Sequence, residues 1–200
     1  MTSYLGFDVL EHRPNMREAV TDVSPRSLAI HDPGLGAREV QARDLAPASQ
    51  RSHLWTAQGL QAIADLRTWL AARRGRVVPF WVSTLRRDLI LAAPADAADA
   101  ALTIEASGYA RFAYPHKARR HLALHLPGAT LYRQVATATE GGATESLALT
   151  SALGTSVPLG TLVSYLVLCR LDADDIELVW HTDQLVEAAL TFREIPEEVP

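Results

Sequence analysis

The chain has 200 residues, of which 48% are hydrophobic and 21% are charged, and this composition is that of an ordinary globular protein. Its formal net charge of -4 disfavours a general nucleic-acid binder, which would be basic. A chain of this length buries enough surface to fold without a metal or a disulfide, and Cys169 is its single cysteine. Residues 1–10 lack the pattern of a signal peptide, and the longest apolar run, residues 162–168, is too short to span a membrane. We expect a protein that is made in the cytosol without membrane insertion.

Three short strands are expected in the N-terminal part, over residues 4–10, 27–31 and 38–45, where apolar and polar residues alternate. The second of them ends in Asp-Pro-Gly at residues 32–34, a strong turn signal. These strands have no obvious partner nearby in the sequence. Their backbone groups therefore need a partner elsewhere in the chain or in another copy of it.

The clearest predicted element is an amphipathic helix over about residues 56–74. Arg73 and Arg74 fall in its last turn, where they suit the helix dipole, and Gly75 follows at the position of a left-handed cap. Its apolar stripe consists of Leu60, Ile63, Leu66, Trp69 and Leu70.

The rest of the chain predicts strands separated by glycine and proline turns. Pro79 indicates that the first of these strands is an edge strand or contains a bulge. The fold class is therefore mainly β with one prominent α-helix, as a β-sandwich or small barrel that ends in an antiparallel meander. We expect an assembly region over residues 1–75 and a β-rich domain over residues 76–200. The expected strands lie at residues 76–85, 89–91, 102–104, 121–126, 130–139 and 146–150, followed by the meander strands 161–171, 176–181 and 186–194. Gly141-Gly142 predicts a hairpin turn, and in the last strand Val186, Ala188, Leu190 and Phe192 share one face.

No pattern in the sequence predicts catalysis or a cofactor. His121 and His125 share one strand face and have metal-ligand spacing, but the cations that precede them favour a solvated face without a metal. Cys169 lies in an apolar run, which is typical of a buried thiol rather than a nucleophile. Asp172 to Asp175 predict a hairpin tip, because the full spacing of a calcium loop is missing. Serine-nucleophile and phosphate-binding motifs are absent from the sequence.

Basic residues gather in two places, and acidic residues gather near the C-terminus, which suits a head-to-tail contact between copies in a ring. Two solvated faces are the alternative. Two aromatic residues beside Pro79 suit an apolar contact, either with the chain's own helix or with a neighbouring copy. The candidate interface residues are Arg73, Arg74, Arg76, Phe80, Trp81, Lys117, Arg119 and Arg120, and their candidate partners are Glu187, Glu194, Glu197 and Glu198.

Two stretches carry a resemblance to a known family. In residues 55–91 the predicted helix ends in Arg-Arg-Gly and is followed by Pro-Phe-Trp-Val, and residues 164–193 contain Cys-Arg-Leu, Trp-His-Thr-Asp and a final alternating strand. Together, about a third of the chain resembles the minor tail and distal tail proteins of bacteriophages. One departure is Ser83-Thr84-Leu85, where those proteins commonly have Pro-x-Trp.

The resemblance implies a β-rich subunit of the virion, assembled in the host cytoplasm. Such subunits form a hexameric ring that links the tail tube to the hub and the receptor-binding apparatus. It implies partners among copies of the chain, the tail tube protein and hub proteins, with no sequence-specific nucleic-acid recognition. A carbohydrate- or receptor-binding module of the same particle is the alternative, and exposed Tyr109, Tyr114 or Tyr132 would favour it. A cell-wall hydrolase would need a cleft with convergent carboxylates or histidines.

Overall fold

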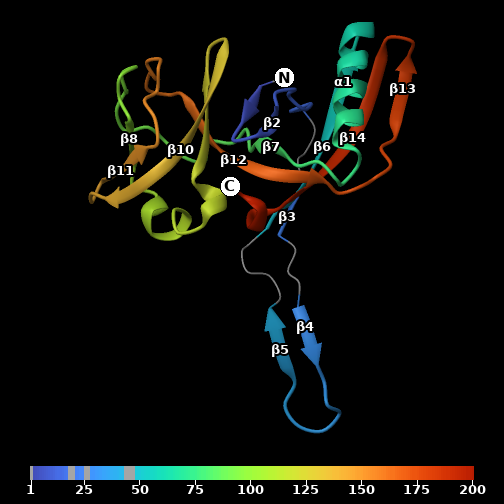
Figure 1. The fold of residues 1–200 in the computed structure, drawn as a ribbon, viewed down its shortest axis with the longest axis horizontal. Coiled ribbons are helices and arrows are strands. Elements are labelled where there is room, and N and C mark those ends of the chain that lie inside the picture. Colours follow the sequence, from blue (N-terminus) through green and yellow to red (C-terminus); the bar gives the residue numbers. More distant parts are fainter. Residues whose placement is uncertain (1, 18–20, 25–27, 43–47) are drawn as a thin grey trace.

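The computed structural model describes residues 2–17, 21–24, 28–42 and 48–200, and it confirms a mainly β protein with one long helix (Figure 1). The N-terminal part contains β1 (Ser3–Tyr4), β2 (Phe7–Leu10), β3 (Thr21–Val23), β4 (Leu28–His31), β5 (Glu39–Ala42), β6 (Gln50–Gln58) and α1 (Leu60–Arg73). The remainder contains β7 (Phe80–Ser83), β8 (Ala101–Glu105), β9 (His121–Leu126), β10 (Ala129–Glu140), β11 (Thr144–Leu149), β12 (Leu162–Leu171), β13 (Leu178–Thr182) and β14 (Leu185–Glu194). Three short helical turns are η1 (Tyr109–Ala113), η2 (Lys117–Arg119) and η3 (Pro196–Glu198).

Twelve of the described strands form one branched sheet. Its main path runs β1-β2-β7-β12-β9-β10-β11-β8, and β14 joins it through β12 while also pairing with β6 and β13. The pairing of β2 with β7 is parallel, and the other named pairs are antiparallel. The sandwich or small barrel that the strand spacing predicts stays a prediction.

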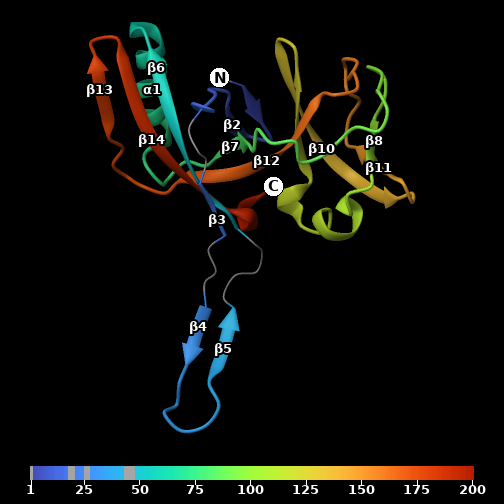
Figure 2. The same ribbon diagram turned by 180° about the vertical axis from the view of Figure 1, so that it is seen from behind.

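Strand β12 runs through both halves of the molecule. Its first part, Leu162 to Tyr165, pairs with β9, its middle pairs with β7, and its last residues, Cys169 to Leu171, pair with β14. Figures 1 and 2 show the two halves that β12 connects: β8, β10 and β11 lie on one side of the centre, and α1, β6, β13 and β14 lie on the other. We call these halves the far lobe and the helix lobe.

Each lobe has its own apolar core. The core of the helix lobe contains Leu10, Trp55, Ala57, Ile63, Leu66, Trp69, Phe80, Val82, Val167, Cys169, Leu171, Val186, Ala188, Leu190 and Phe192. The core of the far lobe contains Leu89, Leu91, Ala95, Leu102, Ile104, Tyr109, Leu122, Leu124, Val135, Leu147, Leu149, Leu153, Val157 and Val163. A smaller cluster between them contains Val9, Trp81, Ala118, Ala123, Leu166, Leu168 and Val199.

The sheet crosses the boundary that the sequence suggested at residue 75. Strand β6 pairs with β14 over nine registered positions, from Gln58 with Leu185 to Gln50 with Arg193. Helix α1 packs into the same core as these C-terminal strands. A division at residue 75 therefore does not separate the two hydrophobic cores.

The helix begins four residues later than the sequence indicated. Residues 56–58 belong to β6, in which Trp55 and Ala57 alternate into the core while Thr56 is exposed. Gly59 ends the strand at a φ of 87°, a left-handed value that glycine adopts without strain. The helix ends as expected in a left-handed conformation, which Arg74 adopts together with Gly75.

The C-terminal strands lie in a different order from a simple meander. Because β6 occupies one edge of β14, both β13 and the end of β12 share the opposite edge, and β12 does not pair with β13. The expected inward face of the last strand is confirmed, since Val186, Ala188, Leu190 and Phe192 are all buried.

Two expectations around β7 are corrected. Pro79 precedes β7, which is internal rather than an edge strand, because β2 and β12 pair with its two sides. Residues 89–91 form no strand, and only Leu89 and Leu91 make single bridges, to Val163 and Ile104.

The second and third N-terminal strands pair with each other, so the expectation that they lack a partner nearby in the sequence is wrong. Strands β4 and β5 form an antiparallel hairpin, and Gly34 in its loop has a φ of 77° and donates its backbone N–H to Asp32 at 3.0 Å. The expected residues 27 and 43–45 lie outside the described part of the chain. Figures 1 and 2 show the hairpin standing clear of the body, and we call residues 28–42 the arm.

Candidate functional site

The arm has one exposed apolar face. Ile30 pairs across the strands with Val40, and Leu28 shares their face, because alternate residues of a strand point the same way. These side chains are 64%, 58% and 53% exposed, and Leu35 in the loop is 91% exposed. A two-stranded hairpin is marginally stable alone in water. An exposed apolar face on such a hairpin is therefore typical of a surface that another protein covers.

The opposite face of the arm is polar. It contains His31, Glu39 and Gln41, and the Gln41 amide donates to the Glu39 carboxylate at 2.5 Å. At the base of the loop Arg38 forms an ion pair with Asp32 at 2.7 Å. The hairpin is thus amphipathic, with its two faces chemically distinct.

Three of the expected interface residues are buried within the chain. Phe80 and Trp81 have no exposed surface, because they lie on opposite faces of an internal strand, and the Trp81 indole N–H donates to the Tyr4 carbonyl at 2.8 Å. Arg73 is 2% exposed and is ion-paired with Asp8. Their expected role in a subunit interface is therefore corrected to one in the core of a single subunit.

The basic cluster before β9 is largely engaged inside the subunit. Arg119 forms a two-pronged ion pair with Glu194, whose side chain is fully buried and also accepts hydrogen bonds from the Ser49 backbone N–H and hydroxyl. Arg120 stacks over the Tyr114 ring at 4.4 Å and donates to the Tyr114 carbonyl. The expected pairing of Arg119 with acids of another copy is therefore wrong.

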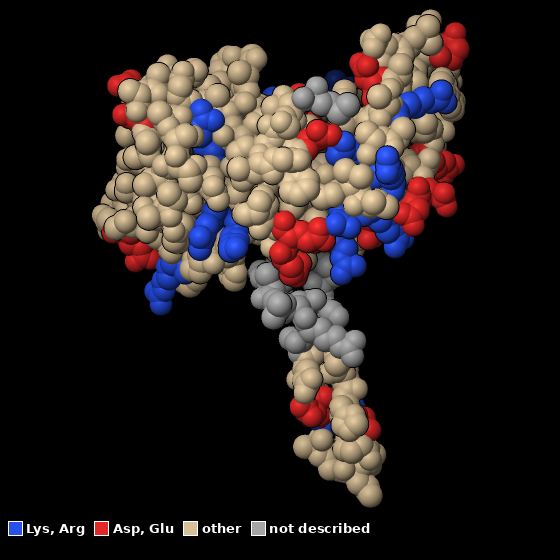
Figure 3. Space-filling view, viewed as in Figure 1, with Lys and Arg blue, Asp and Glu red and all other residues tan. Residues whose placement is uncertain are grey.

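The remaining expected cations are exposed. Arg76 lies near Asp174, with 3.8 Å between Nε and Oδ2, while Arg74 and Lys117 take part in none of the ion pairs among the described residues. A similar acid–base pair joins Arg170 and Glu198. Figure 3 shows basic and acidic groups interspersed over one face of the body, with no single basic field.

The two histidines of β9 lie in separate hydrogen-bond networks, and the solvated face expected for them is wrong, because His121 is buried. His121 is 1% exposed and lies 3.1 Å from the Tyr4 hydroxyl; burial, together with Arg120, lowers its pKa to about 4. Burial also lowers the pKa of His125, with a further contribution from Arg13. Among the described residues, no group of three His, Cys, Asp or Glu side chains could hold a metal ion.

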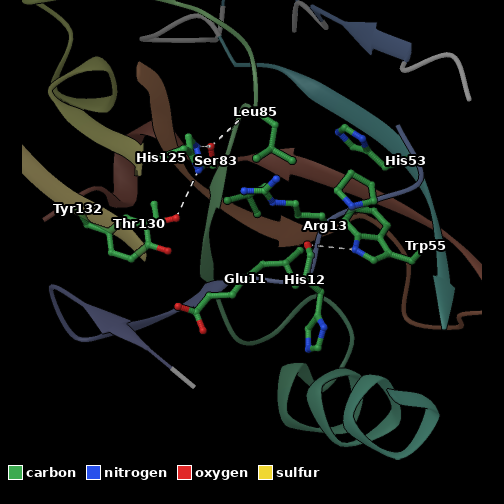
Figure 4. Close-up of a pocket in the computed structure, with 13 residues that line it drawn as sticks. Glu11, His12, Arg13, His53, Trp55, Ser83, Leu85, His125, Thr130 and Tyr132 are labelled. Atoms are coloured by element: carbon green, nitrogen blue, oxygen red, sulfur yellow. Dashed lines mark hydrogen bonds between the residues drawn. The ribbon is translucent and has the colours of Figure 1, made fainter. Parts of the chain in front are cut away.

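A small pocket near β7 contains a serine–histidine pair that the sequence did not indicate (Figure 4). Ser83 Oγ lies 3.0 Å from His125 Nε2. Ser164 Oγ lies 2.7 Å from Ser83 Oγ and 2.9 Å from His125 Nε2. The other ring nitrogen of His125 faces the Thr130 hydroxyl at 3.4 Å.

This pair lacks the arrangement of a nucleophile and its base. A catalytic histidine is oriented by a group that stabilises its charged form, commonly a carboxylate, whereas a hydroxyl faces His125. The pocket has a volume of about 70 Å³, and Ser83 Oγ also accepts the Leu85 backbone N–H at 3.1 Å. The geometry fits a structural hydrogen-bond network that joins β7, β9 and β12.

A much larger groove lies where η1, η2 and η3 meet. Its volume is about 600 Å³, and it is lined mainly by apolar side chains, with Phe112 68% exposed. We call it the Phe112 groove. Its lining residues are Phe112, Ala113, Pro115, His116, Lys117, Ala118, Arg119, Tyr165, Pro196 and Glu197.

A buried carboxylate fixes the backbone that forms this groove. Glu145 is 2% exposed and accepts four backbone N–H groups at the start of η1, from Ser107, Gly108, Tyr109 and Ala110, at 2.6–3.1 Å. Burial alone would raise the pKa of Glu145, but the four donors outweigh it and lower the pKa. These hydrogen bonds therefore fix the start of η1, which contributes Phe112 and Ala113 to the groove.

The tyrosines that would favour sugar binding are tied into the chain. Tyr109 is buried, and its hydroxyl donates to the Arg119 carbonyl at 3.0 Å. Tyr114 and Tyr132 are half-buried, and the Tyr114 hydroxyl donates to the Ala136 carbonyl. These rings do not form an exposed stacking platform.

A scan against protein-family models and a search of curated proteins both found no match to this chain. Within the described residues, no helix combines the length and the apolar character that crossing a bilayer requires. The apolar face of the arm and the Phe112 groove are two candidate functional features of the described residues.

Proposed function

We propose that this chain is a structural subunit of a bacteriophage tail tip. In this proposal, copies of the chain form a ring, hexameric as in distal tail proteins, that links the tail tube to the hub and the receptor-binding apparatus. The subunit is assembled in the host cytoplasm and resides in the virion. The observation that carries the proposal is the arm, which exposes Leu28, Ile30, Leu35 and Val40 away from the body.

The arm supplies a meaningful but limited free energy of association. Full burial of an aliphatic side chain contributes about 1.5–3 kcal/mol, so covering the four partly exposed side chains contributes roughly 4–8 kcal/mol. Association of two proteins costs a comparable amount in translational and rotational freedom. A single arm contact is therefore weak, and a closed ring, in which two contacts hold each subunit, is favoured over a dimer.

The subunit body suits a mechanical role. Several of its acidic and basic groups pair within the chain, as Arg119 does with Glu194, and the Phe112 groove is lined mainly by apolar side chains rather than by convergent catalytic groups. The observations that would favour the carbohydrate-binding alternative, exposed tyrosine rings, are not met by Tyr109, which is buried.

The test is the oligomeric state of two matched arm variants. Ile30→Asp with Val40→Asp places two charges on the apolar face, and Ala29→Asp with Gln41→Asp places two on the polar face at the neighbouring cross-strand pair. Mass in solution, followed by negative-stain imaging with the tail tube protein, should show rings for the wild type and the control and monomers for the apolar-face variant. A wild type that stays monomeric at high concentration and does not bind tube protein would contradict the proposal.

A further inference from the structure

We propose that the small pocket beside β7 binds one tetrahedral oxyanion, phosphate or sulfate, with the Arg13 guanidinium as its principal contact. We call it the Arg13 pocket, and its wall includes Arg13, His53, Ser83, His125 and Thr130 (Figure 4). This site goes beyond the proposed function, because its ligand is a small ion rather than another protein.

The backbone on either side of Arg13 is fixed to β6. The His12 carbonyl accepts the Trp55 indole N–H at 3.3 Å, and the Asn15 backbone N–H donates to the Leu54 carbonyl at 2.7 Å. The segment between these two contacts belongs to no helix or strand. The two hydrogen bonds therefore set the direction from which Arg13 enters the pocket.

The positive charge of Arg13 has no acid partner in the described part of the chain, where this residue takes part in no ion pair. Figure 4 shows its side chain lying across the pocket towards His125. Glu11 also lines the pocket, but its carboxylate points away from the guanidinium and accepts the Thr2 hydroxyl at 2.5 Å. A guanidinium is a planar fork of N–H donors that matches the oxygens of phosphate or sulfate, so an uncompensated one in a pocket is typical of an anion site.

Hydrogen-bonding groups surround the same space. The Ser83 hydroxyl and the His125 ring lie 3.0 Å apart on one side of the pocket, with the Thr130 hydroxyl beside them. On another side the His53 ring lines the pocket, and its Nδ1 is buried without a hydrogen-bond partner among the residues that the structure describes. A buried nitrogen without a partner costs free energy, so an acceptor bound in the pocket would stabilise the folded chain.

The charges around the two histidines favour an anion. Burial lowers the pKa of both His53 and His125. At His53, Arg51 and Arg86 lower the pKa further and outweigh the opposite effect of Asp22, and at His125 the arginine of the pocket lowers it further. A bound anion offsets these cations, which favours the protonated imidazoles and adds donors to the site.

The size of the pocket selects a small ion. Its volume is about 70 Å³, whereas pockets for drug-sized ligands measure roughly 300–1,000 Å³. The Arg13 pocket therefore has room for one ion of a few atoms and excludes a nucleotide or a sugar. Donors on several sides favour a tetrahedral oxyanion, whose oxygens point in four directions, over a planar carboxylate.

The test is a titration with sodium sulfate, exchanged against chloride at constant ionic strength and followed by the histidine side-chain signals in NMR spectra. Histidines titrate between about pH 5 and pH 8, and sulfate keeps both of its charges over this range, so a pH dependence of binding comes from the protein. We expect one saturable site that shifts the signals of His53 and His125 and that phosphate competes for. The affinity should rise as the pH falls, because the anion binds the protonated imidazoles more tightly.

Two arginine variants separate a site from general screening. Arg13→Gln should weaken sulfate binding about tenfold or more, and the fold tolerates the change because this side chain is exposed. Arg17→Gln is the matched control, since Arg17 is an exposed arginine of the same segment that does not line the pocket, and it should leave the affinity unchanged. Without sulfate, Arg13→Gln should also raise the pKa of His125, which checks the placement of Arg13 independently of binding.

Three results would overturn the inference. The first is the absence of a saturable shift of the two pocket histidines with sulfate or phosphate. The second is an equal loss of affinity in both arginine variants, which would mean that the anion only screens the surface. The third is acetate binding as tightly as sulfate, which would assign the pocket to a carboxylate. All three are measured on single subunits, so they leave the test of ring assembly untouched.

Discussion

Removal of the Glu145 carboxylate should destabilise the protein more than any surface change. One oxygen, Oε1, accepts the backbone N–H groups of Ser107 at 2.8 Å, Gly108 at 2.6 Å and Tyr109 at 3.1 Å, and Oε2 accepts that of Ala110 at 2.6 Å. A hydrogen bond to a charged group contributes about 1.5–3 kcal/mol, and a buried N–H that loses its acceptor carries its full desolvation cost. Water reaches some of these donors in the variant, so we expect Glu145→Ala to lower the free energy of unfolding by about 3–5 kcal/mol.

The same carboxylate gives the stability a defined pH dependence. Because the pKa of Glu145 is lower in the folded protein than in the unfolded chain, its contribution is present above the unfolded pKa of about 4.3 and is lost as the pH falls through the folded pKa. Glu145→Gln cannot titrate and should lack this part of the acid dependence.

The assay is urea unfolding followed by tryptophan fluorescence at neutral and acidic pH, with circular dichroism as a second probe. Glu140→Gln is the matched control, since it is an exposed carboxylate that lies across from Glu145 in the β10–β11 hairpin, and it should change stability by less than about 0.5 kcal/mol. A loss below about 1 kcal/mol for Glu145→Ala, or an unchanged acid dependence for Glu145→Gln, would refute the reasoning.

Three further predictions follow from buried groups. Arg119→Met leaves the Glu194 carboxylate unpaired in the interior and should cost about 3–5 kcal/mol in urea unfolding, whereas Arg38→Ala removes an exposed pair and should cost less than about 1 kcal/mol; equal losses would be inconsistent with burial of the first pair. Burial and a nearby cation lower the pKa of His121 from 6.5 to about 4, so the neutral imidazole stabilises the fold above pH 6.5, and about 3 kcal/mol of the free energy of unfolding is lost as the pH falls towards 4. His121→Gln should therefore reduce the slope of stability against pH between 4 and 6.5, and a slope equal to that of the wild type would contradict this prediction. Burial raises the pKa of the Cys169 thiol, so it should react with Ellman's reagent only as fast as the protein unfolds, and a rapid reaction of the native protein would show that the thiol is accessible.

The features that sequence reasoning predicted correctly are local ones. A period of two in residues 186–192 placed the inward face of β14, and Gly141-Gly142 marked the turn between β10 and β11. The left-handed end of α1 was also predicted from Gly75, although Arg74 before it adopts the same conformation. Each of these depends on residues within a few positions of one another.

The features that it missed depend on distant residues. Arg73 suits an exposed helix end by its charge, but its partner Asp8 lies 65 residues away, and no local pattern links the two. The sequence did contain a signal for the burial of Phe80 and Trp81, since three successive apolar residues, 80–82, are typical of a strand covered on both faces. The start of α1 was set too early because Trp55 and Ala57 are paired with β14, more than 120 residues further along the chain.

The candidate site was predictable only in part. Both strands of the arm were expected, together with the turn between them, from the alternation of Leu28 and Ile30 and from Asp-Pro-Gly. Their pairing with each other, and the exposure of their apolar face, required the three-dimensional structure. The Phe112 groove is built from η1, η2 and η3, which join distant parts of the chain, so no sequence pattern marks it.

The course of β12 has a mechanical consequence. Its backbone hydrogen bonds to β9, β7 and β14 run across the strand, so tension applied along it between the two lobes loads many of these bonds at once, in shear. Bonds loaded together resist far more force than bonds that open one after another, as at the end of a hairpin. When a subunit is pulled between its far lobe and its helix lobe, other parts of the chain should therefore unfold before β12 separates from its partner strands.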